Sequence, residues 1–159
     1  MAKAETVPGP LPFALRRAGR DDAAEIAILS ARVRAAKLPY LPRLHTPEED
    51  IEFFGGHVMR SCSVWIAAAE RIVGFIAFRT GWVDHLYVDL GYDRRGIGSA
   101  LLAKAMATES YLQLWAFRRN ESAIAFYLRK GFAPVRETDG SDNEEREPDV
   151  LLAWSKTGG

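Results

Sequence analysis

A turn containing two glycines joins an extended segment to a helix in residues 87–105, YVDLGYDRRGIGSALLAKA. The first amides of a helix have no partners within the helix, and the helix dipole places partial positive charge there. Gly96 and Gly98 leave room for a ligand to reach these amides, and Arg94 and Arg95 add positive charge. The turn lacks the Lys-Ser/Thr pair of a Walker loop and the third glycine of the dinucleotide fingerprint. It therefore predicts an anion site, with phosphate as the expected ligand.

A second group of residues with chemical potential follows in residues 112–132, LQLWAFRRNESAIAFYLRKGF. Asn120 leads a helical pattern, Tyr127 lies inside it, and Gly131 with Phe132 ends it, which gives the spacing Asn-x6-Tyr-x3-Gly-Phe. A phenol can donate a proton and an amide can bind a ligand. Both residues also have structural interpretations, because Asn favours helix N-caps and an aromatic residue on an apolar helix face packs in a core.

Hydrophobic periodicity predicts the elements that position these residues. Period-two or compact apolar runs predict strands over residues 13–18, 63–69, 71–80, 82–90, 111–117, 132–138 and 148–154. Helical periodicity predicts helices over residues 19–36, 46–58, 98–108 and 120–131. Thr46, Pro47 and Glu49 form a helix start signal, and the pair Gly55 and Gly56 weakens the middle of that helix. The middle strands follow one another and helices separate later strands, so we expect a mixed sheet with helices on both faces.

Length and composition fit a single globular unit. The 159 residues carry 21 basic and 21 acidic side chains, a balance that predicts neither a nucleic-acid nor a membrane partner. We expect a flexible leader over residues 1–11 and one domain over residues 12–156. Cys62 has no second cysteine for a disulfide or a metal cluster, and no apolar run reaches the roughly 18 residues of a membrane span. These features favour a cytoplasmic protein without a metal.

Taken together, the glycine turn and the Asn-x6-Tyr-x3-Gly-Phe segment resemble the GNAT superfamily of acetyl-CoA-dependent N-acetyltransferases. The stretch VDHLYVDLGYDRRGIGSALL is similar to its acetyl-CoA motif, and RRNESAIAFYLRKGF is similar to the motif that follows. The resemblance implies an α/β (α+β) GNAT fold, with a mixed, mostly antiparallel central sheet of six to seven strands and helices on both faces. It also implies that the fourth and fifth strands splay at the acetyl-CoA site. Asp93 departs from the usual Arg or Gln, and we expect it to face outward or to pair with an arginine.

The resemblance further implies direct transfer of an acetyl group from acetyl-CoA, as donor substrate, to a primary amine in a ternary complex. Tyr127 would protonate or hydrogen-bond the departing thiolate, Asn120 would bind the pantetheine side, and main-chain groups of the fourth strand would hold the pantetheine arm. The residues implied in donor binding are Leu86, Tyr87, Val88, Arg94, Arg95, Gly96, Ile97, Gly98, Ser99, Ala100, Asn120 and Tyr127.

The general base and the acceptor are less constrained by the sequence. Asp84 is the favoured base, with its neighbour His85 as the alternative, because adjacent strand residues face opposite sides and at most one can serve. Glu52 and His45 are further candidates. The loop over residues 38–45 is a candidate wall of the acceptor site, and the acidic run 139–147 is typical of a solvated loop that a polyamine or basic peptide could use.

Two other functions fit parts of the pattern. A non-catalytic acyl-CoA-binding or regulatory module would keep the pocket without turnover, and a general nucleotide-phosphate binder would let ATP compete with coenzyme A. The resemblance also allows a homodimer, an assembly that many relatives form.

Overall fold

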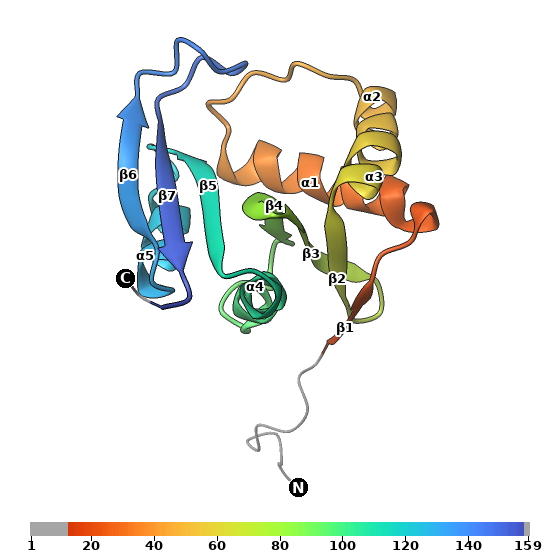
Figure 1. Cartoon of the computed structure of the whole chain (residues 1–159). Helices are drawn as coiled ribbons and strands as arrows, with labels where there is room; N and C mark the ends of the chain where they lie inside the picture. Colours follow the sequence, from red (N-terminus) through yellow and green to blue (C-terminus); the bar gives the residue numbers. More distant parts are fainter. Residues whose placement is uncertain (1–12, 158–159) are drawn as a thin grey trace, which may run out of the picture.

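A seven-stranded mixed sheet is the framework of the protein, for which a computed structural model describes residues 13–157 (Figure 1). The strand order is β1-β2-β3-β4-β5-β7-β6, and every neighbouring pair is antiparallel except β4 and β5. The strands are β1 (Ala14–Arg17), β2 (Ser63–Ala68), β3 (Ile72–Arg79), β4 (Gly81–Val88), β5 (Tyr111–Phe117), β6 (Ala133–Thr138) and β7 (Asp149–Ser155). The mixed sheet predicted from the sequence is confirmed, whereas the leader predicted over residues 1–11 lies outside the described residues.

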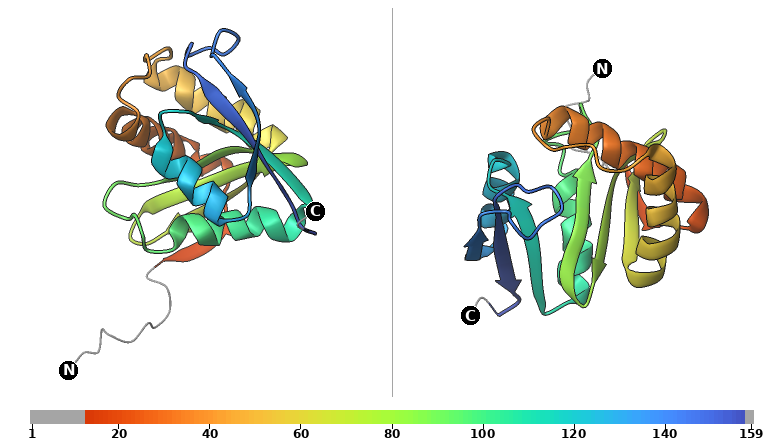
Figure 2. Two further views of the ribbon diagram at one scale, coloured as in Figure 1. Left: turned by 90° about the vertical axis from the view of Figure 1, so that its left-hand side faces the viewer. Right: turned by 90° about the horizontal axis from the view of Figure 1, so that it is seen from above.

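Helices cover both faces of this sheet, as the sequence predicts (Figures 1 and 2). One face carries η1 (Arg20–Asp22), α1 (Ala23–Lys37), α2 (Pro47–Glu52), the π-helical turn η2 (Phe53–Val58) and α3 (Met59–Ser61). The opposite face carries α4 (Ile97–Thr108) and α5 (Glu121–Arg129). No helix within residues 13–157 is both long and apolar enough to cross a lipid bilayer.

Strand β3 divides the interior into two cores because both of its faces are buried. Val73, Ile76 and Phe78 pack in the core on the α4 and α5 side. Phe75 and Ala77 pack in the core beneath α1. From Phe75 to Phe78 the residues alternate between the two cores, so the strand supplies both at once, which explains why it reads as an almost continuous apolar run.

The helix that starts at Thr46 confirms its sequence signal. The Thr46 hydroxyl oxygen accepts a hydrogen bond from the Glu49 amide at 3.1 Å, and the Glu49 carboxylate accepts one from the Thr46 amide at 2.8 Å. This reciprocal pair is a capping box. The glycine pair Gly55 and Gly56 does not end the helix but lies in the wider π-helical turn η2.

The sheet opens between β4 and β5. Their ladder contains Gly81 opposite Leu112 and Trp82 opposite Gln113, and within the described residues it ends there. The view from above in Figure 2 shows the two strands diverging from this point. The edge of β4 that faces β5 is therefore left without a strand partner along the segment that includes Leu86, Tyr87 and Val88, and the predicted splay is confirmed.

Gly74 on β3 allows α4 to approach the sheet, which leads to a first prediction. A Cβ atom at this position would lie 3.0 Å from Ile97 Cγ2 and 3.1 Å from the Tyr87 carbonyl oxygen. We expect Gly74→Ala to lower the free energy of unfolding by roughly 1–3 kcal/mol, because overpacking forces neighbours to shift. Urea unfolding would measure the change. Gly19→Ala is the control, since the nearest atom to its added Cβ lies at 4.0 Å; equal losses in both variants would contradict the argument.

Candidate active site

The turn before α4 has the geometry of an anion-binding helix N-terminus. Gly96 is the N-cap residue with φ of +82°, and a Cβ atom on it would meet no other heavy atom within 4 Å. The Ala100 amide donates to the Gly96 carbonyl oxygen at 2.9 Å and starts the helical pattern. The amides of Ile97, Gly98 and Ser99 come before this bond, so they are the ones left for an anion.

Charged side chains of the turn point in different directions. Arg94 adopts a left-handed backbone with φ of +63°, and both Arg94 and Arg95 are exposed. The Arg95 guanidinium lies 5.2 Å from the ring centre of Tyr92. Asp93 forms an ion pair with Lys37 Nζ at 2.6 Å. The expected outward or paired position of Asp93 is therefore confirmed, with a lysine rather than an arginine as its partner.

Asp89 anchors the start of this loop to two other elements. Its side chain is only 1% exposed and accepts hydrogen bonds from Arg32 Nε at 3.0 Å and Arg32 Nη2 at 2.8 Å. Arg71, from the β2–β3 connection, also donates to this carboxylate and stacks over the ring of Tyr92. The Leu90 amide donates to Asp89 Oδ1 at 2.8 Å. One buried carboxylate thus fixes where β4 ends and the glycine turn begins.

Tyr127 and Asn120 lie on α5, at opposite ends of it. Tyr127 is buried, and its ring packs against Phe126 and Phe132. Burial, together with the nearby Tyr87, raises the pKa of Tyr127, so its phenol is protonated at neutral pH. Asn120 is the N-cap residue, and its side-chain oxygen accepts from the Ala123 amide at 3.4 Å. The capping role of Asn120 is therefore present.

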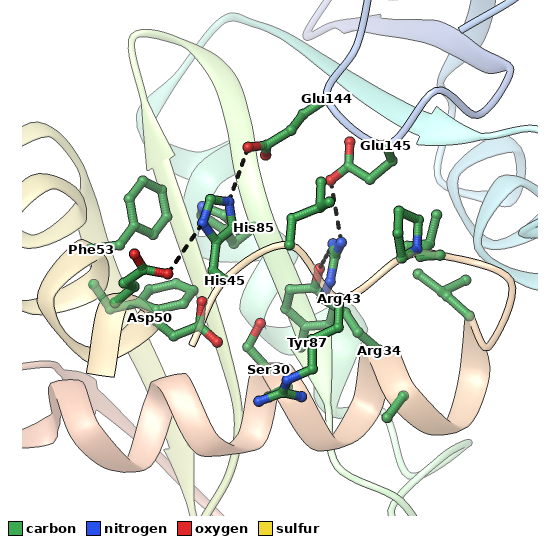
Figure 3. A pocket seen from close by; sticks show the side chains of 18 of the residues that line it. Ser30, Arg34, Arg43, His45, Asp50, Phe53, His85, Tyr87, Glu144 and Glu145 are labelled. Carbon is green, nitrogen blue, oxygen red and sulfur yellow. Dashed lines mark hydrogen bonds and ion pairs between the residues drawn. The ribbon is translucent and has the colours of Figure 1, made fainter. Parts of the chain in front are cut away.

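A cavity of about 660 Å³ lies on the other face of the sheet, between α1, α2 and the splayed strand β4 (Figure 3). Its lining comes from three parts of the chain that are far apart in the sequence. Residues 30–54 contribute Ser30, Ala31, Arg34, Ala35, Leu38, Pro39, Leu41, Pro42, Arg43, Leu44, His45, Glu49, Asp50, Phe53 and Phe54; β4 contributes His85 and Tyr87; and the loop between β6 and β7 contributes Glu144 and Glu145. The loop over residues 38–45, predicted as an acceptor-site wall, contributes to this lining.

Two side-chain bridges reach the loop between β6 and β7, one from the loop before α2 and one from α1 (Figures 1 and 3). His45 Nε2 lies 3.0 Å from Glu144 Oε2, and the Arg34 guanidinium donates to Glu145 Oε2 at 3.3 Å. Arg34 also donates to the Tyr87 hydroxyl at 3.3 Å. The predicted solvated acidic loop is therefore part of the cavity wall.

Asp84, the favoured base, is not among the residues that line this cavity. Arg79 Nε donates to the Asp84 carboxylate at 2.7 Å, and Cys62 Sγ lies 3.5 Å from it. The register of β3 and β4 shifts between Ala77 and Phe78, and the side chain of His85 faces the cavity instead. Burial lowers the pKa of His85 to about 4, so the imidazole is neutral at pH 7.

The two further candidates for the base, His45 and Glu52, also differ in whether they line the cavity. His45 lines the cavity, whereas Glu52 is not among its lining residues. Sequence reasoning missed Arg34, Asp50 and Phe53 as lining residues. Phe53 carries one available signal, because it is an apolar residue next to a weak helical turn. Arg34 and Asp50 carry none, since charged residues on amphipathic helices are ordinarily on the solvated face.

No group of three or more His, Cys, Asp or Glu side chains in residues 13–157 is arranged to hold a metal ion. What the site offers is a free strand edge, an anion-binding turn and a cavity lined with ionisable groups. This arrangement can hold a long phosphate-bearing ligand along β4 and a second, smaller ligand in the cavity.

Comparison with known proteins identifies the family. Residues 60–134 match the family model described as an acetyltransferase (GNAT) domain. The uncharacterized N-acetyltransferase YafP of Escherichia coli (strain K12) is 39% identical over 75 residues, which cover 46% of this chain and 48% of that relative. The chain thus spans about half the length of YafP. The peptidyl-lysine N-acetyltransferase YjaB of the same organism is 24% identical over 89% of this chain and 97% of YjaB.

Solved structures show the same fold. The solution structure of apo YjaB from Escherichia coli has a TM-score of 0.72 at 22% identity, covering 89% of this chain and 97% of that chain. The PaiA N-acetyltransferase of Thermoplasma acidophilum, solved in complex with coenzyme A, has a TM-score of 0.71 at 19% identity, covering 90% and 98%. The match to the acetyltransferase model over residues 60–134, the N-acetyltransferase relatives and the shared fold together support membership of the chain in the GNAT superfamily of N-acetyltransferases, which are acyltransferases.

Proposed function

We propose that this protein transfers the acetyl group of acetyl-CoA directly to the primary amine of an acceptor, in a ternary complex. One observation carries the proposal: the free edge of β4 separates an anion-binding turn from a cavity on the opposite face of the sheet. Donor and acceptor would approach this edge from opposite faces. Neither would then block the other, and no covalent enzyme intermediate is needed.

The donor would bind through main-chain groups and the glycine turn. The amides of residues 97–100, with Arg94 and Arg95, would hold the pyrophosphate. Main-chain groups of Leu86, Tyr87 and Val88 would pair with the pantetheine arm as an added strand would. The Asn120 oxygen caps α5, which leaves its amide nitrogen to donate to the pantetheine. The coenzyme A in the PaiA structure supports this choice of donor.

The chemistry requires a neutral amine and a protonated leaving group. The amine nitrogen attacks the thioester carbonyl carbon, the C–S bond breaks, and the sulfur leaves with the electron pair. Tyr127, kept protonated by burial, would give its proton to that sulfur or hydrogen-bond it. A thiolate is already a good leaving group, so this step accelerates the reaction without being indispensable.

His85 replaces Asp84 as the candidate for receiving the proton of the ammonium group. Its neutral imidazole lines the cavity, whereas the Asp84 carboxylate is held by Arg79. An alkyl ammonium has a pKa of about 10.4, far above that of His85, so the imidazole would pass the proton on to water rather than keep it. We therefore propose that His85 relays the proton from the ammonium group of the acceptor to water.

Thermal unfolding with matched concentrations of acetyl-CoA, coenzyme A and ATP tests the donor site. A ligand at about 100 times its dissociation constant adds about 2.7 kcal/mol of stability. For a domain of this size, the midpoint should then rise by about 5–10 °C with acetyl-CoA and coenzyme A. ATP should give little or no rise. Equal rises with all three would favour a general nucleotide-phosphate binder, and no rise with any would contradict the donor site.

Release of free thiol from acetyl-CoA in the presence of amines separates the enzyme from a non-catalytic acyl-CoA-binding module. The name of YjaB, a peptidyl-lysine N-acetyltransferase, makes a lysine-containing peptide one of the first acceptors to test. Binding of acetyl-CoA without thiol release for any amine would favour the binding module.

A further inference from the structure

We infer, on the basis of the proposed function, that the acceptor is a small primary monoamine with an apolar or aromatic body, and that Asp50 binds its ammonium group. Three features of the cavity carry this inference: the apolar side chains exposed in it, a carboxylate that forms no ion pair within the described residues, and the side-chain bridges between the segments that line it. Each points to a small molecule rather than to a lysine on a protein surface.

The first feature is an aromatic wall. The rings of Phe53 and Phe54 lie 5.8 Å and 5.1 Å from that of His85, and Tyr87 continues the row at 6.5 Å. Phe53 is nevertheless 43% exposed, and Leu44 on the facing loop is 44% exposed. Large apolar side chains that stay exposed around a cavity are typical of a site that receives an apolar ligand.

The second feature is an unpaired carboxylate. Glu144 and Glu145 pair with His45 and Arg34, and Glu49 caps its own helix. Asp50 takes part in none of the ion pairs found in residues 13–157, and Figure 3 shows its carboxylate directed into the cavity.

An ammonium group between Asp50 and the aromatic wall would gain both an ion pair and contact with ring faces. Arg43 also lines the cavity and is exposed. Its positive charge opposes a second ammonium group in the ligand. Glu49, Glu144 and Glu145 also line the cavity, but each already has a partner. Asp50 is the one lining carboxylate without a partner among residues 13–157, and a single such carboxylate suits a monoamine rather than a polyamine.

The third feature is closure and size. A volume of about 660 Å³ lies within the range of about 300–1,000 Å³ that is usual for small-molecule sites. The bridge from His45 to Glu144 ties the loop before α2 to the loop between β6 and β7, and the bridge from Arg34 to Glu145 ties α1 to that same loop. A lysine of a folded protein would have to separate these loops, whereas a free amine of small size fits beneath them.

A matched panel of acceptors with the full-length protein tests the inference. Thiol release would be measured at saturating acetyl-CoA with phenethylamine, hexylamine, spermidine, phenylalanine and an N-acetylated peptide that contains one lysine. We expect kcat/KM for phenethylamine and hexylamine to exceed that for the other three by at least about tenfold, a ratio that corresponds to one well-placed contact. A preference for spermidine, phenylalanine or the peptide would overturn the inference and leave the acetyltransferase activity standing.

Asp50→Asn tests the role of the carboxylate. We expect KM for phenethylamine to rise about tenfold or more, with kcat changed less and with the thermal shift by acetyl-CoA unchanged. Asp50→Glu should restore part of the loss. Glu48→Gln is the control, because Glu48 lies on the same helix, is exposed and does not line the cavity. An unchanged KM in Asp50→Asn would overturn the assignment. Thiol release with none of the amines, despite a thermal shift with acetyl-CoA, would overturn the activity and the acceptor class together.

Discussion

Replacing Asp89 with alanine should lower the free energy of unfolding by about 2–3 kcal/mol at pH 7 and weaken acetyl-CoA binding. Loss of one partner from a buried ion pair typically costs about 3–5 kcal/mol, and the value is smaller here because Arg32 and Arg71 are 43% and 49% exposed. The binding effect follows because this carboxylate holds the start of the glycine turn. Urea unfolding and the KM for acetyl-CoA would measure the two effects.

Asp93→Asn is the matched control for the Asp89 variant, since Asp93 lies in the same loop but forms an exposed pair with Lys37. Exposed pairs contribute about 0–1 kcal/mol. Equal losses in the two variants would contradict the anchoring role of Asp89.

The same carboxylate gives the stability a defined dependence on pH. Burial alone would raise the pKa of Asp89, but hydrogen bonds from Arg32, Arg71 and the Leu90 amide outweigh burial and lower it to about 2. A carboxyl group whose pKa is lower in the folded state stabilises the protein above its unfolded pKa of about 3.9. This contribution is lost as the pH falls from about 4 to about 2. The stability difference between the native chain and Asp89→Asn should therefore shrink as the pH falls below about 4.

Tyr127→Phe should lower kcat by about 10- to 100-fold while leaving the KM for acetyl-CoA and its thermal shift nearly unchanged. General acid catalysis usually contributes about 10²–10⁴-fold, and a thiolate needs the proton less than most leaving groups do. The phenyl ring still fills the space among Phe126 and Phe132, so the core should tolerate the change. Steady-state kinetics with any accepted amine would measure it.

Tyr111→Phe is the control for the tyrosine variant, because Tyr111 is exposed on β5 and lies outside the proposed site. A Tyr127→Phe enzyme with native kcat would exclude Tyr127 as the acid. A large rise in the KM for acetyl-CoA would instead assign Tyr127 to donor binding.

Local signals in the sequence were enough to place most elements. Thr46 and Glu49 form the expected capping box, and Gly131, with φ of +100°, follows the last turn of α5 as expected. Such signals act between residues a few positions apart, so they do not depend on the rest of the fold. The splay of β4 from β5, in contrast, came from the family resemblance and not from periodicity.

The acceptor side of the site could not be predicted because it depends on contacts between distant segments. The bridge between His45 and Glu144 spans 99 positions, and that between Arg34 and Glu145 spans 111. The prediction that Asp84 and His85 face opposite sides assumed a regular strand, but the register between β3 and β4 shifts between Ala77 and Phe78 and leaves Asp84 without a partner in the ladder. Which of the two faces the cavity depends on this irregularity and on where α1 and α2 pack. The sequence pattern of β4 alone does not contain that information.

The short ladder between β4 and β5 has a mechanical consequence. Two residue pairs are all that join β1–β4 to β5–β7 within the described sheet. A donor lying along the free edge of β4 would act as a clamp across this opening, so the sheet would stiffen when the donor binds and loosen when coenzyme A leaves. Each catalytic cycle would then bridge and release the opening between β4 and β5, and the bound donor would take the place of the missing strand contacts for as long as it stays.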